Sequence, residues 1–142
     1  RERLKPVDLR ALLLEELAAY NLHTSDRVHL TGEPVYVRAE AGQPLAMAFH
    51  ELATNAAKYG AFSEPSGTLD VSWGLQRDGT RLDIEWREIR RSPVESPNQC
   101  GFGSQLIRSV VERQLRGTVW FAWEPDGLRC TISIPMHSAA PS

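Results

Sequence analysis

Cysteine is scarce in this sequence, and the two cysteines that occur form no recognisable site. Cys100 and Cys130 lack the spacing of metal ligands, and no cluster of cysteine, histidine and aspartate fits a zinc site. Their small number is typical of reduced thiols in a cytoplasmic protein, and a disulfide between them stays open as an alternative. We therefore expect a cytoplasmic location and no zinc.

Long apolar runs and a strong charge of one sign are also missing. No apolar run approaches the ~18 residues that a membrane span requires, and we expect no signal peptide in this sequence. The net charge of -2 gives no reason to expect contact with nucleic acid or a membrane. Neither a Gly-x-Ser-x-Gly elbow nor a Walker A loop occurs, so the chemistry must rest on other motifs.

The size and composition are those of one globular domain. The chain has 142 residues, of which 42% are hydrophobic and 24% charged, so it can bury a core of its own. Because it starts at Arg1 without a methionine, we expect a piece of a longer protein. We predict a linker at residues 1–6, a folded domain at residues 7–136 and a tail at residues 137–142.

Apolar periodicity divides the chain into three helices that alternate with pairs of strands. Helices are expected from an Asp8 N-cap to Tyr20, from near Pro44 to Gly60, and from Gly101 to Gly117. The expected strands cover residues 27–31, 35–38, 68–76, 81–88, 118–124 and 128–135. Strands that come in hairpins imply a mixed, mostly antiparallel sheet with the helices on one face. The predicted fold class is therefore an α/β (α+β) two-layer sandwich.

The most informative stretch is FHELATNAAKYGA, at residues 49–61. On a helix, Glu51, Asn55 and Lys58 share one face, about a third of a turn from an apolar stripe. An amide oxygen such as that of Asn55 can be the one protein ligand of a nucleotide-bound Mg²⁺. Glu51 could orient or deprotonate a water, and Lys58 could pair with a phosphate. The alternative is an ordinary solvated helix face. The stripe comprises Leu45, Ala48, Phe49, Leu52, Ala53 and Ala56.

Two further stretches could bind a nucleotide. Gly101-Phe102-Gly103-Ser104 opens a helix, where backbone amides bind phosphate, although a glycine-rich helix start is common. Glu88 ends a strand and could accept a hydrogen bond from the amino group of adenine; the alternative is an exposed terminal glutamate. Trp86 is expected in the core, and His50, on neither face of its helix, is expected to be structural.

Taken in order, HELATNAAKYGA, Trp86-x-Glu88, a proline-containing loop and GFGS resemble the catalytic domain of one family of bacterial sensor histidine kinases. This is the HWE family, named for residues that correspond here to His50, Trp86 and Glu88. The resemblance covers the chain from Val7 to Pro135. It implies the Bergerat-type ATP-binding fold of the gyrase-, Hsp90- and MutL-like ATPases.

The resemblance also implies a reaction and its residues. ATP and Mg²⁺ would be the cofactors, with Glu51 and Asn55 catalytic and Asn55 the Mg²⁺ ligand. The γ-phosphoryl group would pass to a histidine on an upstream dimerisation domain, then to an aspartate of a response-regulator receiver domain. That histidine is expected before Arg1, so this stretch alone would not phosphorylate itself. The implied ATP-binding residues are His50, Asn55, Lys58, Tyr59, Glu88, Gly101, Phe102, Gly103 and Ser104.

One departure from the family pattern leaves alternatives open. After the Trp-x-Glu motif the family has a pair of glycines, and this chain has Arg90 and Arg91 in WREIRRSPV. The two arginines could obstruct the base or turn toward the phosphates. The chain could then be a nucleotide-poor member that acts as an interaction module. An anti-sigma-type serine kinase of the same fold is a further alternative.

Overall fold

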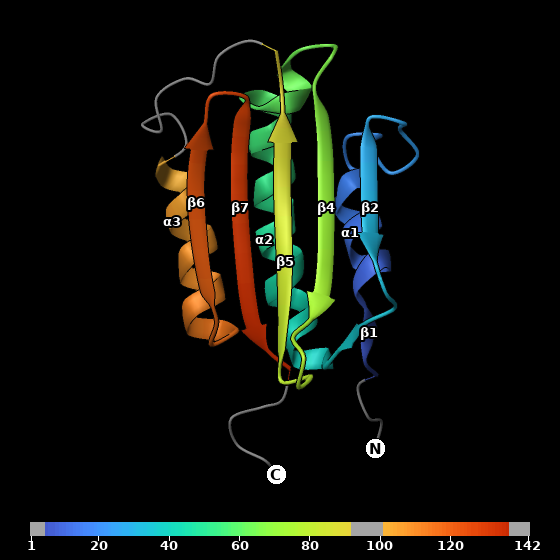
Figure 1. Cartoon of the computed structure of the whole chain (residues 1–142), viewed down its shortest axis with the longest axis vertical. Coiled ribbons are helices and arrows are strands. Elements are labelled where there is room, and N and C mark those ends of the chain that lie inside the picture. Colours follow the sequence, from blue (N-terminus) through green and yellow to red (C-terminus); the bar gives the residue numbers. More distant parts are fainter. Residues whose placement is uncertain (1–4, 92–100, 137–142) are drawn as a thin grey trace.

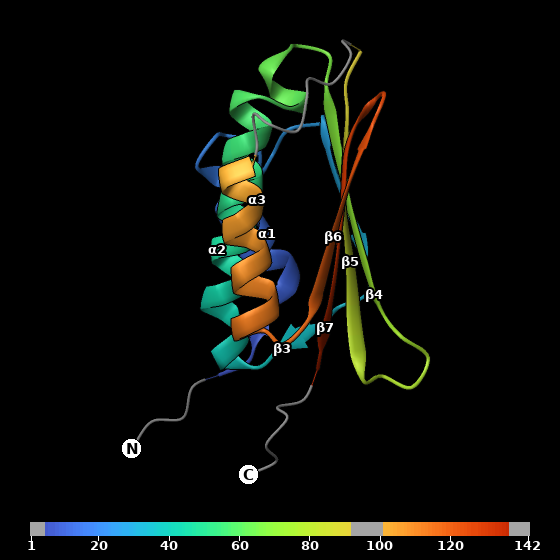
Figure 2. The ribbon, with the colours of Figure 1, turned by 90° about the vertical axis from the view of Figure 1, so that its left-hand side faces the viewer.

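A five-stranded sheet forms one layer of the molecule, and three helices cover one of its faces (Figures 1 and 2). This computed structural model describes residues 5–91 and 101–136. The strand order is β2-β4-β5-β7-β6; β2 is parallel to β4, and the other neighbours are antiparallel. The predicted mixed, mostly antiparallel α+β sandwich is confirmed. The strands are β2 (Val28–Gly32), β4 (Thr68–Leu75), β5 (Arg81–Ile89), β6 (Thr118–Glu124) and β7 (Gly127–Pro135).

The helical layer consists of α1 (Leu9–Ala18), α2 (Ala39–Lys58) and α3 (Gly101–Ser109), and α3 continues into a π-helical segment, η3 (Val110–Gln114). The carboxylate of Asp8 accepts a hydrogen bond from the backbone N–H of Arg10 at 3.2 Å, which confirms the expected N-cap of α1. Within the described ranges, none of these helices has the length and apolarity that a membrane crossing requires.

The core lies between the two layers, and α2 is at its centre. All six residues of the predicted apolar stripe are at most 1% exposed. They face the inner side of the sheet, where Leu82, Ile84 and Trp86 of β5 are fully buried, because alternate residues of a strand point to the same face. The periodic positions of the sequence therefore define the core correctly.

The strand predicted at residues 35–38 pairs differently from the expected hairpin. The two-residue strand β3 (Tyr36–Val37) pairs with β1 (Val7–Asp8), and β2 pairs with β4 instead. The backbone N–H of Leu9 donates to the carbonyl of Val35 at 3.0 Å, which holds this segment beside the start of α1. Residues 36–37 thus complete a small second sheet.

The central helix also begins earlier than expected, at Ala39, so that Pro44 lies inside it. Proline removes one backbone donor from the helix, and this made a start near Pro44 the simpler prediction. The turn before Pro44 stays helical because its residues pack in the core. Ala41, Gly42 and Pro44 are buried, and Gly42 packs against the side chain of Val7.

The helical segment before β6 ends through Arg116, which has a φ of 58°, and not through Gly117 as expected. Gly117 is needed for a different reason. A Cβ atom there would lie 2.2 Å from the carbonyl oxygen of Ser133 on β7, so only glycine lets the two backbones approach.

Replacing Gly117 with alanine should therefore lower the free energy of unfolding by about 1–3 kcal/mol, since the backbone of β7 must move. The matched control is Gly74→Ala in β4, where nothing lies within 4 Å of the added Cβ atom. Urea unfolding of both variants measures the difference. Equal losses of stability would contradict the close-approach explanation.

Candidate functional site

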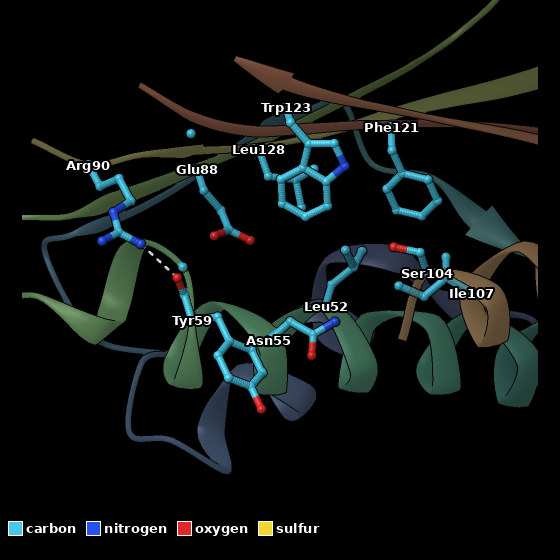
Figure 3. A pocket seen from close by; sticks show the side chains of 12 residues that line it. Leu52, Asn55, Tyr59, Glu88, Arg90, Ser104, Ile107, Phe121, Trp123 and Leu128 are labelled. Carbon is cyan, nitrogen blue, oxygen red and sulfur yellow. Dashed lines mark hydrogen bonds between the residues drawn. The ribbon is translucent and has the colours of Figure 1, made fainter. Parts of the chain in front are cut away.

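A pocket lies between the C-terminal half of α2 and the inner face of the sheet (Figure 3). Leu52 and Asn55 line it from α2, and Tyr59 lines it from the C-cap position directly after α2, because residues three or four apart share one face of a helix. Ser104 and Ile107 contribute from α3. The sheet side is mainly apolar and aromatic, with Phe121, Trp123 and Leu128 from β6 and β7. Such walls suit a flat, partly apolar ring.

Glu88, near the end of β5, brings a buried carboxyl group into this pocket. It is 3% exposed and is the one buried charged side chain in the described ranges. Its Oε2 accepts a hydrogen bond from Trp86 Nε1 at 2.9 Å, and its Oε1 accepts one from the backbone N–H of Ala61 at 3.1 Å. The first contact is possible because positions 86 and 88 of a strand point to the same face. Each oxygen keeps a further lone pair for a ligand.

The surroundings of Glu88 act on its pKa in opposite directions. Burial raises the pKa of Glu88, while the hydrogen bonds from Trp86 and Ala61 and the charge of Arg90 act in the opposite direction. Gly60 makes room for the carboxylate, since a Cβ atom there would lie 2.0 Å from its Oε1.

Arg27, directly before β2, fixes the loop that carries Ala61. Its Nε donates to the carbonyl of Gly67 at 2.7 Å, and its Nη2 donates to that of Glu64 at 2.6 Å. The guanidinium also lies over the ring of Phe62, 4.8 Å from the centroid. The short 3₁₀ helix η1 (Ala61–Ser63) is therefore held in the position that satisfies Glu88.

The predicted site residues fall into three groups. Asn55, Tyr59, Glu88 and Ser104 line the pocket together. Residues 101–103 form the first turn of α3. Glu51, Lys58 and His50 are on α2 but outside the lining; Lys58 is exposed, and Nδ1 of His50 lies 3.3 Å from Oε1 of Glu16 on α1.

Other predictions are settled by burial. The interpretation of Glu88 as an exposed terminal glutamate is wrong, and Trp86 is in the core as expected. Most of the proline-containing loop after Trp86-x-Glu88 lies outside the described residues, as do Cys100 and the predicted tail at residues 137–142. Ile89 itself belongs to β5.

Several pocket residues were not singled out from the sequence. Phe121 and Trp123 alternate along β6 like any inward-facing strand residues, so periodicity predicts core positions. Only the placement of β6 beside β7, opposite α3, turns them into a pocket wall. Arg27 carries no sequence signal, because its partners are backbone carbonyls more than thirty residues away.

The chemistry of the pocket fits an adenine nucleotide with a phosphate-bound metal ion. No group of three histidine, cysteine, aspartate or glutamate side chains in the described part of the chain could hold a metal by itself. A magnesium ion would therefore need phosphate oxygens in addition to Asn55.

In sequence, the chain is similar to histidine kinases. No protein-family model matches it. It is 32% identical over 136 residues to a blue-light-activated histidine kinase of Rhizobium johnstonii, which covers 96% of this chain and 38% of that relative. The chain therefore spans well under half of that relative's length.

Solved structures share the fold. The histidine kinase domain of the blue-light-activated kinase from Erythrobacter litoralis EL346 matches with a TM-score of 0.73 at 18% identity, over 96% of this chain and 65% of that chain. The catalytic domain of histidine kinase ThkA matches with a TM-score of 0.70 at 15% identity, over 95% and 97% of the two chains. ThkA in complex with the response regulator TrrA matches with a TM-score of 0.67 at 14% identity, over 94% and 42%.

The fold is that of the catalytic domains of histidine kinases. In sequence, the chain is similar to blue-light-activated histidine kinases over nearly its whole length, so the resemblance that its ordered motifs indicated is confirmed.

The buried carboxylate should make the stability of the protein depend on pH. Because the pKa of Glu88 is raised by burial, the unfolded chain loses this proton first as the pH rises. The contribution of Glu88 to stability is thus fully present below the ordinary glutamate pKa and is lost as the pH passes through the raised value. Relative to Glu88→Gln, the wild type should lose stability across that window.

Urea unfolding of the wild type and Glu88→Gln between about pH 4 and pH 8 measures this difference. Glu15→Gln, at an exposed position of α1, is the control and should show no such trend. A difference between wild type and Glu88→Gln that is flat or grows with pH would contradict the direction of the shift.

Proposed function

We propose that this chain is the Mg-ATP-binding catalytic domain of a sensor histidine kinase, acting on a histidine of an upstream dimerisation domain. The observation that carries the proposal is the buried carboxylate of Glu88 in a pocket with apolar and aromatic walls. It accepts hydrogen bonds from Trp86 and Ala61 and can accept another from the amino group of adenine.

The residues of α2 would serve the phosphate side. When bound, ATP would supply the phosphoryl group and Mg²⁺ would neutralise charge on the phosphates. Asn55 lines the pocket and offers an amide oxygen as metal ligand. Glu51, one turn earlier, would orient a metal-bound water, and Lys58, one turn later, would pair with a phosphate at the mouth.

The other predicted residues have supporting roles. Ser104 lines the pocket, and the backbone amides of residues 101–104 at the start of α3 would hold phosphate. Tyr59 would contact the nucleotide from the end of α2. His50, paired with Glu16, would act by fixing α2 against α1 and not by touching ATP.

The partners follow from the reaction. We propose that the catalytic domain begins near Val7 and has two partners. The first is an upstream dimerisation domain that carries the acceptor histidine, and the second is a response-regulator receiver domain that takes the phosphoryl group onward. The complex of ThkA with TrrA supports the second partner, since that kinase has this fold. The reaction would take place in the cytoplasm.

Replacing Asn55 with alanine should weaken ATP binding in the presence of Mg²⁺ at least about tenfold, or about 1.4 kcal/mol, because the metal loses its protein ligand. Isothermal titration calorimetry with ATP, with and without Mg²⁺, measures the effect. Met47→Ala, at an exposed position of the same helix, is the control and should bind like wild type. An equal loss without Mg²⁺ would refute the role as metal ligand.

Transfer in trans tests the reaction itself. Mixed with its upstream helical domain and ATP labelled at the γ-phosphate, the chain should place acid-labile label on that domain, and Asn55→Ala should reduce it. Acid-stable phosphoserine on a partner would instead favour the anti-sigma-type kinase. No ATP binding by the wild-type chain would favour the interaction module.

A further inference from the structure

Arg90, which occupies a position where the family pattern has glycine, lines the pocket next to Glu88. Its backbone N–H donates to the carbonyl of Asp126, in the turn between β6 and β7, at 2.7 Å. Its side chain crosses to the helical layer, where Nη1 donates to the carbonyl of Tyr59 at 2.6 Å (Figure 3). One residue thus joins the end of β5 to the end of α2.

A second anchor holds the guanidinium from the loop after η1. Arg90 Nε lies 3.6 Å from Oε1 of Glu64, and both side chains are about 13–14% exposed. The other oxygen of Glu64 accepts the backbone N–H of Arg91 at 2.8 Å and the hydroxyl of Ser66 at 3.1 Å. These contacts keep the cation of Arg90 at the Glu88 end of the pocket.

The charge of Arg90 matters because Glu88 is buried. The titratable groups around this carboxylate are Arg90 after β5, Cys130 on β7 and Tyr59 at the end of α2, with Glu64 behind Arg90. Burial, together with the smaller effect of Glu88, raises the pKa of the Cys130 thiol to about 12, so this thiol is neutral near pH 7. Among the described residues, Arg90 is the cation that favours the ionised form of Glu88.

We propose that Arg90 is a specificity-positioning residue, which holds Glu88 as a pure hydrogen-bond acceptor so that the pocket selects a base with an amino group. The ionised carboxylate accepts from the 6-amino group of adenine and repels the 6-oxo group of hypoxanthine. A protonated carboxyl can also donate, and so it pairs with either base. This inference rests on the proposed nucleotide site.

The test compares Arg90→Gln with the neighbouring control Arg91→Gln, whose side chain is exposed and whose backbone N–H donates to Glu64. The first readout is the carboxyl ¹³C titration of Glu88. Its pKa should rise in Arg90→Gln and stay unchanged in Arg91→Gln. Arg90→Lys keeps the charge and should restore the wild-type titration in large part.

The second readout is the ratio of the dissociation constants of ITP and ATP, measured by calorimetry with Mg²⁺. This ratio should fall severalfold in Arg90→Gln, and in the wild type it should fall as the pH is lowered. An unchanged ratio in Arg90→Gln, or an equal fall in Arg91→Gln, would overturn the inference alone. Failure of the wild type to bind either nucleotide would overturn the proposed nucleotide site as well.

Discussion

The carboxylate of Glu88 is the group on which the pocket depends. A buried charge is costly unless donors satisfy it, and here the donors come from two places. Trp86 donates from the same strand, and Ala61 donates from the loop after α2. The bonds therefore fix the position of the sheet relative to the end of α2, and Gly60 permits the approach. The hydrogen bonds that satisfy the Glu88 carboxylate in the pocket therefore also hold the sheet against the end of α2.

The Trp-x-Glu spacing has a simple physical meaning in this structure. Two residues apart on a strand is the separation that puts both side chains on one face. The indole of Trp86 fills the core while its N–H satisfies Glu88. A motif that could be taken for a hydrophobic anchor plus an unrelated acid is thus one hydrogen-bonded unit.

Local pattern predicted the parts of the fold that depend on local chemistry. The stripe on α2 and the inward face of β5 follow from periodicities of 3.6 and 2, and both are buried as expected. The pairing of β3 with β1 was missed because it joins segments separated by α1 and β2, where sequence adjacency misleads. The aromatic wall at Phe121 and Trp123 and the anchoring of Arg90 at Tyr59 required three-dimensional neighbours.

The buried, neutral thiol of Cys130 makes its rate of alkylation a measure of how often the core opens. Only a thiolate reacts readily with alkylating agents, and this thiol is fully buried with its pKa raised to about 12. Modification of Cys130 must then wait for β7 to separate from its neighbours. The alkylation rate of Cys130 would therefore report the frequency with which the sheet opens near Glu88. A ligand that holds the helical layer against the sheet would lower this rate.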